Sequence, residues 1–206
     1  MLLRWRHRGA ADAGRLGLCS EQFANPLHRD MEKQRIHPLE KLRADTQAFL
    51  DVLNGEPDFS VVIISIGYVD ACLAALLHRF LIQSSVTEEL LDPRRGPLGS
   101  FATKADLAYV LGLIPKSMYL DLQQLAEIRN QVAHHHLNLN FADASISDAC
   151  LKLQYLGTLK IGDFDEPAFP PERMPSPKEQ FKFTAVVISN LLLTESERIA
   201  RRETAA

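Results

Sequence analysis

The chain has 206 residues, of which 46% are hydrophobic and 24% are charged, with 23 basic and 26 acidic side chains. These values are typical of a globular protein of one domain, and they exclude a chain that is mainly disordered. The net charge of -3 excludes a protein whose whole surface binds nucleic acid through basic side chains, and leaves open a local basic patch.

Residues 1–30 differ from the rest because they contain five Arg against three acidic residues and show no amphipathic period. A signal peptide needs an apolar run that residues 1–20 do not supply. We therefore expect residues 1–30 to be a flexible basic tail, or to precede the true start at Met31. Residues 31–206 are then expected to form one domain.

The cysteines and the longest apolar segment both point to a cytoplasmic protein. Cys19, Cys72 and Cys150 stand singly, without a CxxC pair, which suits a reducing compartment. The segment from Val61 to Ile82 is interrupted by polar residues such as Asp70, so it is expected to be a buried helix and not a membrane span. Cys72 and Cys150 are expected to fill the core.

Helical periods dominate the first two thirds of the chain. A helix is predicted after Pro38, because Leu39, Leu42, Phe49, Leu50 and Leu53 recur at three- and four-residue spacing, and Gly55 ends it. The central core helix is expected over 59–82. Two Pro and two Gly make 90–100 irregular, after which Ser100 caps a helix over 101–111. The helix expected over 115–134 places Met118, Leu122, Leu125 and Val132 on its buried side.

The last third predicts two more helices around a proline-rich loop. The first covers 141–156, with Ser145 or Ser147 as its cap and Ile146, Cys150, Leu151 and Leu153 facing inward. The loop, 157–177, holds five of the eleven prolines and has room for a short strand at 159–161. The final helix runs from Lys178 to about Arg202. The fold class is therefore all-α, a single-domain helical bundle.

The most compact group of chemically active residues is Arg129, Asn130 and His134, at the end of the helix over 115–134. An Arg can neutralise a phosphate, and a His titrates near neutral pH and can transfer a proton. Arg129 and His134 are five residues apart, about 140° round a helix, so a straight helix does not direct them to one target.

The alternative for the same residues is structural. In it, Arg129 is a half-buried cation that needs an acidic partner, and Asp70 on the central helix is the partner we expect. A metal site at His134, His135 and His136 is disfavoured because consecutive helical residues point in different directions. No cofactor and no metal are expected.

Direct DNA reading is not expected either. The helix after the turn at Gly112 carries Asp121 and Glu127 where a recognition helix needs a basic face. Arg94 and Arg95 form the only basic doublet of the central region, and the GPLGS loop lacks the Lys and spacing of a phosphate-binding loop.

Taken in order, these segments resemble the mannitol operon repressor family over about residues 39–195. The matching segments, as they stand in this sequence, are FLDVLNGEPD, IGYVDACLAALLHRFL, GPLGSFATKADLAYVLGLI, LAEIRNQVAHH, NFADASISDACLKL and FKFTAVVISNLLL. The resemblance implies a HEPN-like helical fold, in which an Arg, a polar neighbour and a His four to six positions beyond the Arg serve RNA cleavage without metal. Arg129, Asn130 and His134 fit that pattern.

Three functions follow as hypotheses. The first is a transcription regulator, a homodimer, that acts through a protein partner and not by reading DNA. The second is a metal-independent ribonuclease that binds RNA in a cleft around Arg129 and uses His134 as acid or base. The third is a helical module of a toxin, defence or stress system that is held by an antitoxin-like partner.

Overall fold

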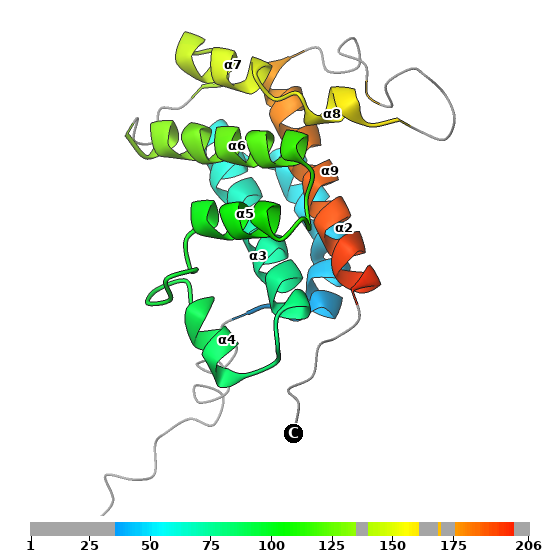
Figure 1. The fold of residues 1–206 in the computed structure, drawn as a ribbon. Helices are drawn as coiled ribbons and strands as arrows, with labels where there is room; N and C mark the ends of the chain where they lie inside the picture. Colours follow the sequence, from blue (N-terminus) through cyan, green and yellow to red (C-terminus); the bar gives the residue numbers. More distant parts are fainter. Residues whose placement is uncertain (1–35, 135–139, 161–168, 170–175, 200–206) are drawn as a thin grey trace, which may run out of the picture. The chain divides into compact units, whose positions relative to one another are not determined.

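The computed structural model describes residues 36–134, 140–160, 169 and 176–199, and all the regular structure in this part is helical (Figure 1). The all-α prediction is therefore confirmed. The helices are α2 (Leu39–Gly55), α3 (Asp58–Phe80), α4 (Ser85–Leu90), α5 (Phe101–Val110), α6 (Lys116–His134), α7 (Ala144–Leu151), α8 (Tyr155–Thr158) and α9 (Pro177–Arg198).

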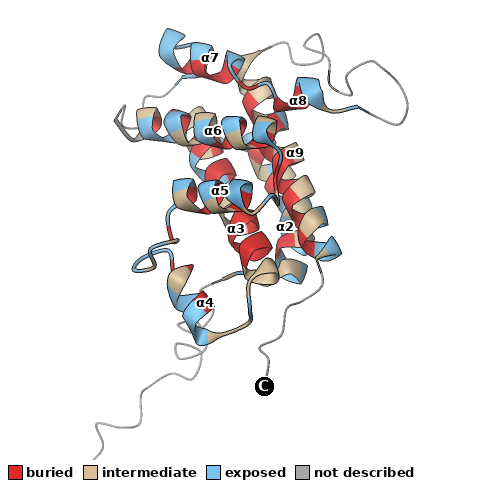
Figure 2. Ribbon diagram, in the orientation of Figure 1, coloured by how far each residue is buried: buried red, intermediate tan, exposed pale blue. Residues whose placement is uncertain are grey.

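The predicted central helix is α3, which packs against α2, α5, α6 and α9. Figure 2 shows it as the most continuously buried helix of the domain. By length and composition α3 could cross a membrane, but 61% of its most apolar window is buried inside the fold, as in the core helix of a soluble protein. Its buried residues include Val69, Leu73 and Leu76, each with no side-chain exposure.

The amphipathic pattern of α6 is confirmed. Met118, Leu122, Leu125 and Val132 are at most 3% exposed, and they face the core together with Ile128. α9 likewise buries Phe181, Ala185, Ile188 and Leu192, while Leu191 is only partly buried. These two helices, with α3, supply much of the apolar core.

Local sequence signals set several helix ends. The Ser100 hydroxyl accepts a hydrogen bond from the Thr103 backbone N–H, so the predicted cap of α5 is confirmed. Ser84 and Ser176 cap α4 and α9 in the same way. The short helix α4 was not predicted, although Ser84 is its visible signal. Gly112 lies two residues after the end of α5 and has a φ of 71°, a backbone conformation that favours glycine.

The segment between α4 and α5 is a compact turn. Gly96 and Gly99 are required there, because a Cβ on Gly99 would lie 2.1 Å from the carbonyl oxygen of Asp92 and one on Gly96 would lie 2.3 Å from that of Leu90. The Asp92 carboxylate accepts hydrogen bonds from the backbone N–H groups of Arg94 and Arg95. The prediction of an irregular segment is confirmed.

The single helix predicted over 141–156 is wrong. The structure has α7, a break at 152–154 and the one-turn helix α8. The N-terminal cap position of α7 is Asp143, and neither Ser145 nor Ser147 takes that role. Ile146, Cys150 and Leu153 are buried as expected, but Leu151 is 60% exposed.

The remaining predictions fall mainly on residues that the structure does not describe. These include the tail 1–30, Cys19, His135 and His136, most of the loop 157–177, and the end of the last helix beyond Ile199. Of the strand expected at 159–161, Leu159 is irregular, Lys160 forms an isolated bridge and Ile161 is not described. The described residues contain no strand.

Candidate functional site

Arg129 and Asn130 lie on the surface near the end of α6, where both side chains are exposed. α6 continues through His134, so the helix does not end before it, and the two positions stay about 140° apart. The side chain of His134 is not among those described. The structure thus leaves the catalytic assignment of Arg129, Asn130 and His134 as a prediction.

The expected ion pair between Asp70 and Arg129 is not formed. Asp70 instead pairs with Lys104 of α5, with 2.7 Å between the Nζ and Oδ1 atoms. The Lys104 side chain is 2% exposed and that of Asp70 is 29% exposed. Among the described residues, the buried cation is therefore Lys104. The sequence did not predict this burial, because a lysine gives no local signal that it is buried.

An aromatic surface lies on the outer side of α5 and α6. The rings of Tyr109 and Tyr119 stack with centroids 4.6 Å apart and planes 9° apart. The Tyr119 hydroxyl donates a hydrogen bond to Asp106 and accepts one from Gln123. Val110, which follows Tyr109 in the chain, is 79% exposed. We call Tyr109, Val110 and Tyr119 the tyrosine surface. Its two tyrosines come from different helices, so no single-helix pattern could have paired them.

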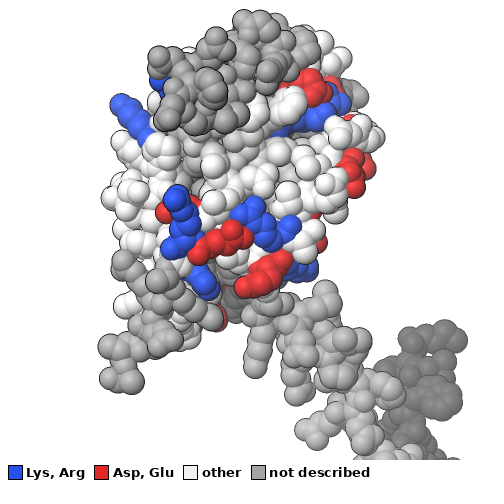
Figure 3. All heavy atoms as spheres, turned by 90° about the vertical axis from the view of Figure 1, so that its right-hand side faces the viewer, with Lys and Arg blue, Asp and Glu red and all other residues white. Residues whose placement is uncertain are grey.

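The loop with Arg94 and Arg95 does not present a phosphate-binding cradle. The backbone N–H of Gly96 bonds to the carbonyl of Asp92, and the N–H of Gly99 bonds to the carbonyl of Gly96. These two backbone N–H groups therefore form hydrogen bonds within the turn, which agrees with the turn predicted for this segment. On the face shown in Figure 3, basic and acidic side chains lie beside one another and form no separate basic patch.

Asp121 does not belong to the exposed acidic face that the sequence suggested for α6. It is 2% exposed, and its carboxylate accepts hydrogen bonds of 2.9 Å from the backbone N–H groups of Gln154 and Tyr155. Burial raises the pKa of Asp121, and the two backbone hydrogen bonds lower it part of the way back. Asp121 therefore has a structural role, whereas Glu127 is exposed.

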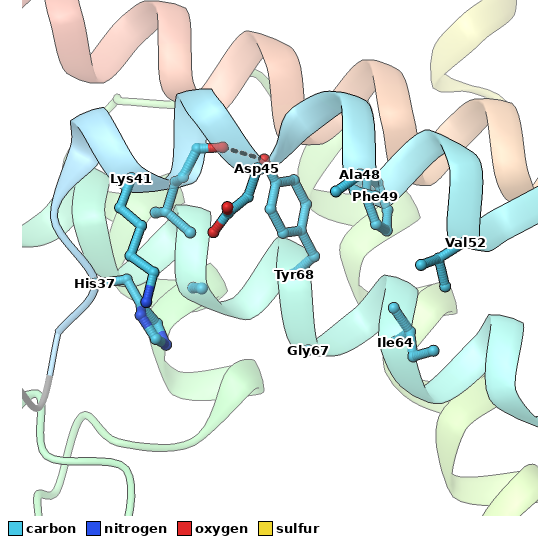
Figure 4. Close-up of a pocket in the computed structure, with 11 residues that line it drawn as sticks. His37, Lys41, Asp45, Ala48, Phe49, Val52, Ile64, Gly67 and Tyr68 are labelled. Carbon is cyan, nitrogen blue, oxygen red and sulfur yellow. Dashed lines mark hydrogen bonds between the residues drawn. The ribbon is translucent and has the colours of Figure 1, made fainter. Parts of the chain in front are cut away.

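A groove of about 360 Å³ runs between α2 and α3 (Figure 4). Its apolar floor includes Ile64 and Gly67 of α3, and Gly67 is exposed, with no atom within 4 Å of where a Cβ would lie. The Tyr68 hydroxyl cannot donate a hydrogen bond to a molecule in the groove, because it already donates one to the backbone carbonyl of Leu42 at 2.5 Å. The full lining is His37, Lys41, Leu42, Asp45, Ala48, Phe49, Val52, Ile64, Gly67, Tyr68 and Ala71.

Charged side chains lie at one end of this groove. In Figure 4, Lys41 reaches towards His37, and the Asp45 carboxylate lies between Lys41 and Tyr68. These residues were not predicted from the sequence. The available signal was the spacing of His37, Lys41 and Asp45, four residues apart each time, beside a glycine within an apolar helix.

Cys72 and Cys150 are free thiols with no exposure, so the prediction that they fill the core is confirmed. Burial raises the pKa of each thiol from 9.0 to about 12, which makes both poor nucleophiles at neutral pH. Among the described residues, no three His, Cys, Asp or Glu side chains gather where they could hold a metal ion.

Comparison with known proteins gives the chain a family. No curated protein matches it. A protein chain in the X-ray structure of the MtlR–HPr complex from Escherichia coli has a similar fold, with a TM-score of 0.56 and 22% identity, over 72% of this chain and 98% of that one. Residues 64–201, more than half of the sequence, match the family described as mannitol repressor. The chain belongs to the mannitol repressor family, as its sequence resemblance implied.

Proposed function

We propose that this protein is a mannitol-repressor-like regulator of transcription that acts in the cytoplasm through a protein partner. Its membership of the family is the observation that carries the proposal. The similar fold in the MtlR–HPr complex supports the same view, since that structure contains a protein partner. HPr is therefore the partner that we propose for this chain.

The charge distribution supports an indirect action on DNA. The helix that follows the Gly112 turn, α6, exposes Glu127 and Gln123 where a recognition helix would place basic residues. Arg94 and Arg95 lie on a turn and not on a helix. A protein that contacts DNA through phosphate needs several exposed cations on one face.

We place the partner contact on the tyrosine surface. Tyrosine is enriched in protein interfaces because one end of its ring is apolar and the other can form hydrogen bonds. Tyr109 and Tyr119 are held by their mutual stacking, and Tyr119 also by Asp106 and Gln123, so little side-chain freedom is lost on binding. The exposed Val110 adds an apolar contact at the edge.

The test is binding of purified HPr by titration calorimetry. The variant Val110→Glu puts a charge on the tyrosine surface and is expected to weaken binding at least tenfold, because a buried unpaired charge is costly at an interface. Val86→Glu is the matched control, since Val86 is 61% exposed on α4, away from the tyrosine surface. If Val110→Glu and Val86→Glu bind HPr equally well, the partner contact does not lie on the tyrosine surface. If the parent chain does not bind HPr, HPr is not the partner.

A gel-shift titration against the protein's own operon tests the indirect action. We expect no sequence-specific shift by the protein alone at about 200 mM salt, where contacts to phosphate are weakened. Tight specific binding under this condition would contradict the proposal.

The homodimer and the RNA-cleaving role also remain proposals. No observation on the described residues favours ribonuclease activity over regulation, so the roles of Arg129, Asn130 and His134 in RNA cleavage stay predictions from the resemblance.

A further inference from the structure

We infer that the cavity between α6 and the α7–α8 break is a binding site for a neutral small molecule with several hydroxyl groups, a sugar or a sugar alcohol. The cavity has a volume of about 340 Å³, which falls at the small end of the roughly 300–1,000 Å³ that ligand pockets occupy. The inference goes beyond the proposed function, which needs only a protein partner.

One wall of the cavity is a face of α6. It consists of Ser117, Leu120, Asp121 and Gln124, at the three- and four-residue spacing that places side chains on one side of a helix. Asp121 is 2% exposed and Leu120 is 50% exposed. The wall therefore runs from a buried carboxylate to the open surface.

The opposite wall comes from the segment where the predicted helix over 141–156 is broken. Lys152 and Gln154 lie in this break, and Thr158 lies at the end of α8. The Asp121 carboxylate accepts hydrogen bonds from the backbone N–H groups of Gln154 and Tyr155, so it holds this wall beside α6. The contact that breaks the helix thus also builds the cavity.

Asp121 keeps acceptor capacity for a ligand. Each of its two oxygens accepts one backbone hydrogen bond, whereas a carboxylate offers about four lone-pair positions. A hydroxyl group in the cavity can donate to a position that remains. Burial also raises the pKa of Asp121, and titratable groups that are perturbed by burial in a cleft are common at functional sites.

Four further polar groups around the cavity are not used by the fold. The Ser117 hydroxyl, the Gln124 and Gln154 side-chain amides and the Lys152 ammonium form no hydrogen bond or ion pair with another described residue. Hydroxyl and amide side chains both donate and accept hydrogen bonds. They match a ligand whose hydroxyl groups also do both.

The charge of the described lining favours a neutral ligand. Lys152 and Asp121 are its charged residues, and their charges sum to zero. A phosphate would be attracted by Lys152 alone and repelled by the Asp121 carboxylate, whereas phosphate sites gather several donors and cations.

The chemistry of the same lining favours hydroxyl groups over rings or apolar groups. None of these residues is aromatic, so the cavity offers no stacking surface for a nucleobase. Leu120 is the one large apolar residue among them. An apolar ligand would leave the amides and Asp121 without hydrogen bonds to it, at a cost in affinity.

The test is titration calorimetry of the full chain with mannitol, sorbitol and glucose as probes. We expect at least one of them to bind with a Kd below about 1 mM. Cyclohexanol, a ring with a single hydroxyl, is expected not to bind, because it leaves most of the polar groups unpaired. Inorganic phosphate is expected to bind more weakly than the best neutral probe.

Two variants locate the site. Gln124→Ala and Gln154→Ala each remove hydrogen bonds to the ligand and are expected to weaken binding about three- to tenfold. Neither side chain is bonded within the described fold, so circular dichroism and thermal unfolding should be unchanged. Gln47→Ala is the matched control, since Gln47 is exposed on α2, bonds to Asp51 and does not line the cavity.

Each contrary result overturns a defined part of the inference. If none of the three probes binds up to about 10 mM, the site is overturned. Binding that Gln124→Ala and Gln154→Ala leave unchanged would place it outside this cavity. Phosphate or cyclohexanol that binds as well as the best probe overturns the ligand class. HPr binding is measured separately, so none of these results decides the proposed function.

Discussion

Lys104 is a cation almost fully inside the fold, held by the half-buried carboxylate of Asp70. The two residues differ in what their loss does. Asp70→Ala leaves the Lys104 charge buried without its partner, which we expect to cost about 3 kcal/mol in the free energy of unfolding. Lys104→Met leaves Asp70 with access to water, so we expect it to cost less. Urea unfolding measures both values.

A matched control for this pair is Asp51→Ala, at an exposed carboxylate on α2 that bonds only to the neighbouring Gln47 among the described groups. Its effect should stay within about 0.5 kcal/mol. Equal losses for Asp70→Ala and Lys104→Met would contradict the assignment of Lys104 as the buried charge.

At the scale of single residues, apolar burial was predictable and polar burial was not. The period of α6 placed Met118, Leu122, Leu125 and Val132 correctly, because a stripe on one helix is a local property. Lys104 and Asp121 are buried because of partners on other segments, Asp70 on α3 and the start of α8. No local pattern carries that information, so the sequence led us to pair Asp70 with Arg129.

At the scale of elements, most helix ends agree with the sequence to within a few residues, because caps and breakers act locally. Ser100, Gly55 and Gly112 are examples. The break between α7 and α8 is different. There Asp121, from α6, fixes the backbone of Gln154 and Tyr155, and a contact from so far along the chain overrides the continuous helical period of 141–156.

The link from α6 to α8 can be tested by removing its carboxylate. Asp121→Ala leaves two backbone N–H groups at the start of α8 without their acceptor. We expect a loss of about 2–4 kcal/mol in the free energy of unfolding, because an unpaired N–H costs about 1–3 kcal/mol when it is buried, as at Tyr155, and less when it is part-buried, as at Gln154. Asp121→Asn keeps one acceptor oxygen and should lose less. Asp148→Ala, at an exposed residue of α7, is the control in the same urea titration. Equal stability of Asp121→Ala and this control would contradict the role of Asp121.

At the scale of the whole molecule, the family and the all-α class were predictable, and the candidate surfaces were only partly so. Arg129 and Asn130 were found from a motif along one helix. The tyrosine surface and the α2–α3 groove each need two helices to meet at particular faces. Helical periods say which side of a helix is apolar, but they do not say which neighbour covers it or how much stays open.

The two buried thiols make the stability of the whole fold depend on pH. Cys72 on α3 and Cys150 on α7 have pKa values raised from 9.0 to about 12 by burial. Because the folded pKa is the higher one, the folded chain keeps protons that the unfolded chain releases above pH 9. The stabilisation is complete below about pH 9 and is lost as the pH rises towards 12.

We therefore expect the free energy of unfolding to fall between pH 8 and 10, by about 1.4 kcal/mol per thiol at pH 10, because that pH lies one unit above the unfolded pKa of 9.0 and still well below the folded pKa of about 12. Urea titrations at several pH values measure this slope. Cys150→Ala removes one of the two thiols, so its slope should be shallower than that of the parent even though its stability at pH 8 is lower. Identical slopes in the two proteins would show that Cys150 ionises as freely in the folded chain as in the unfolded one, and would contradict its burial on the inner face of α7.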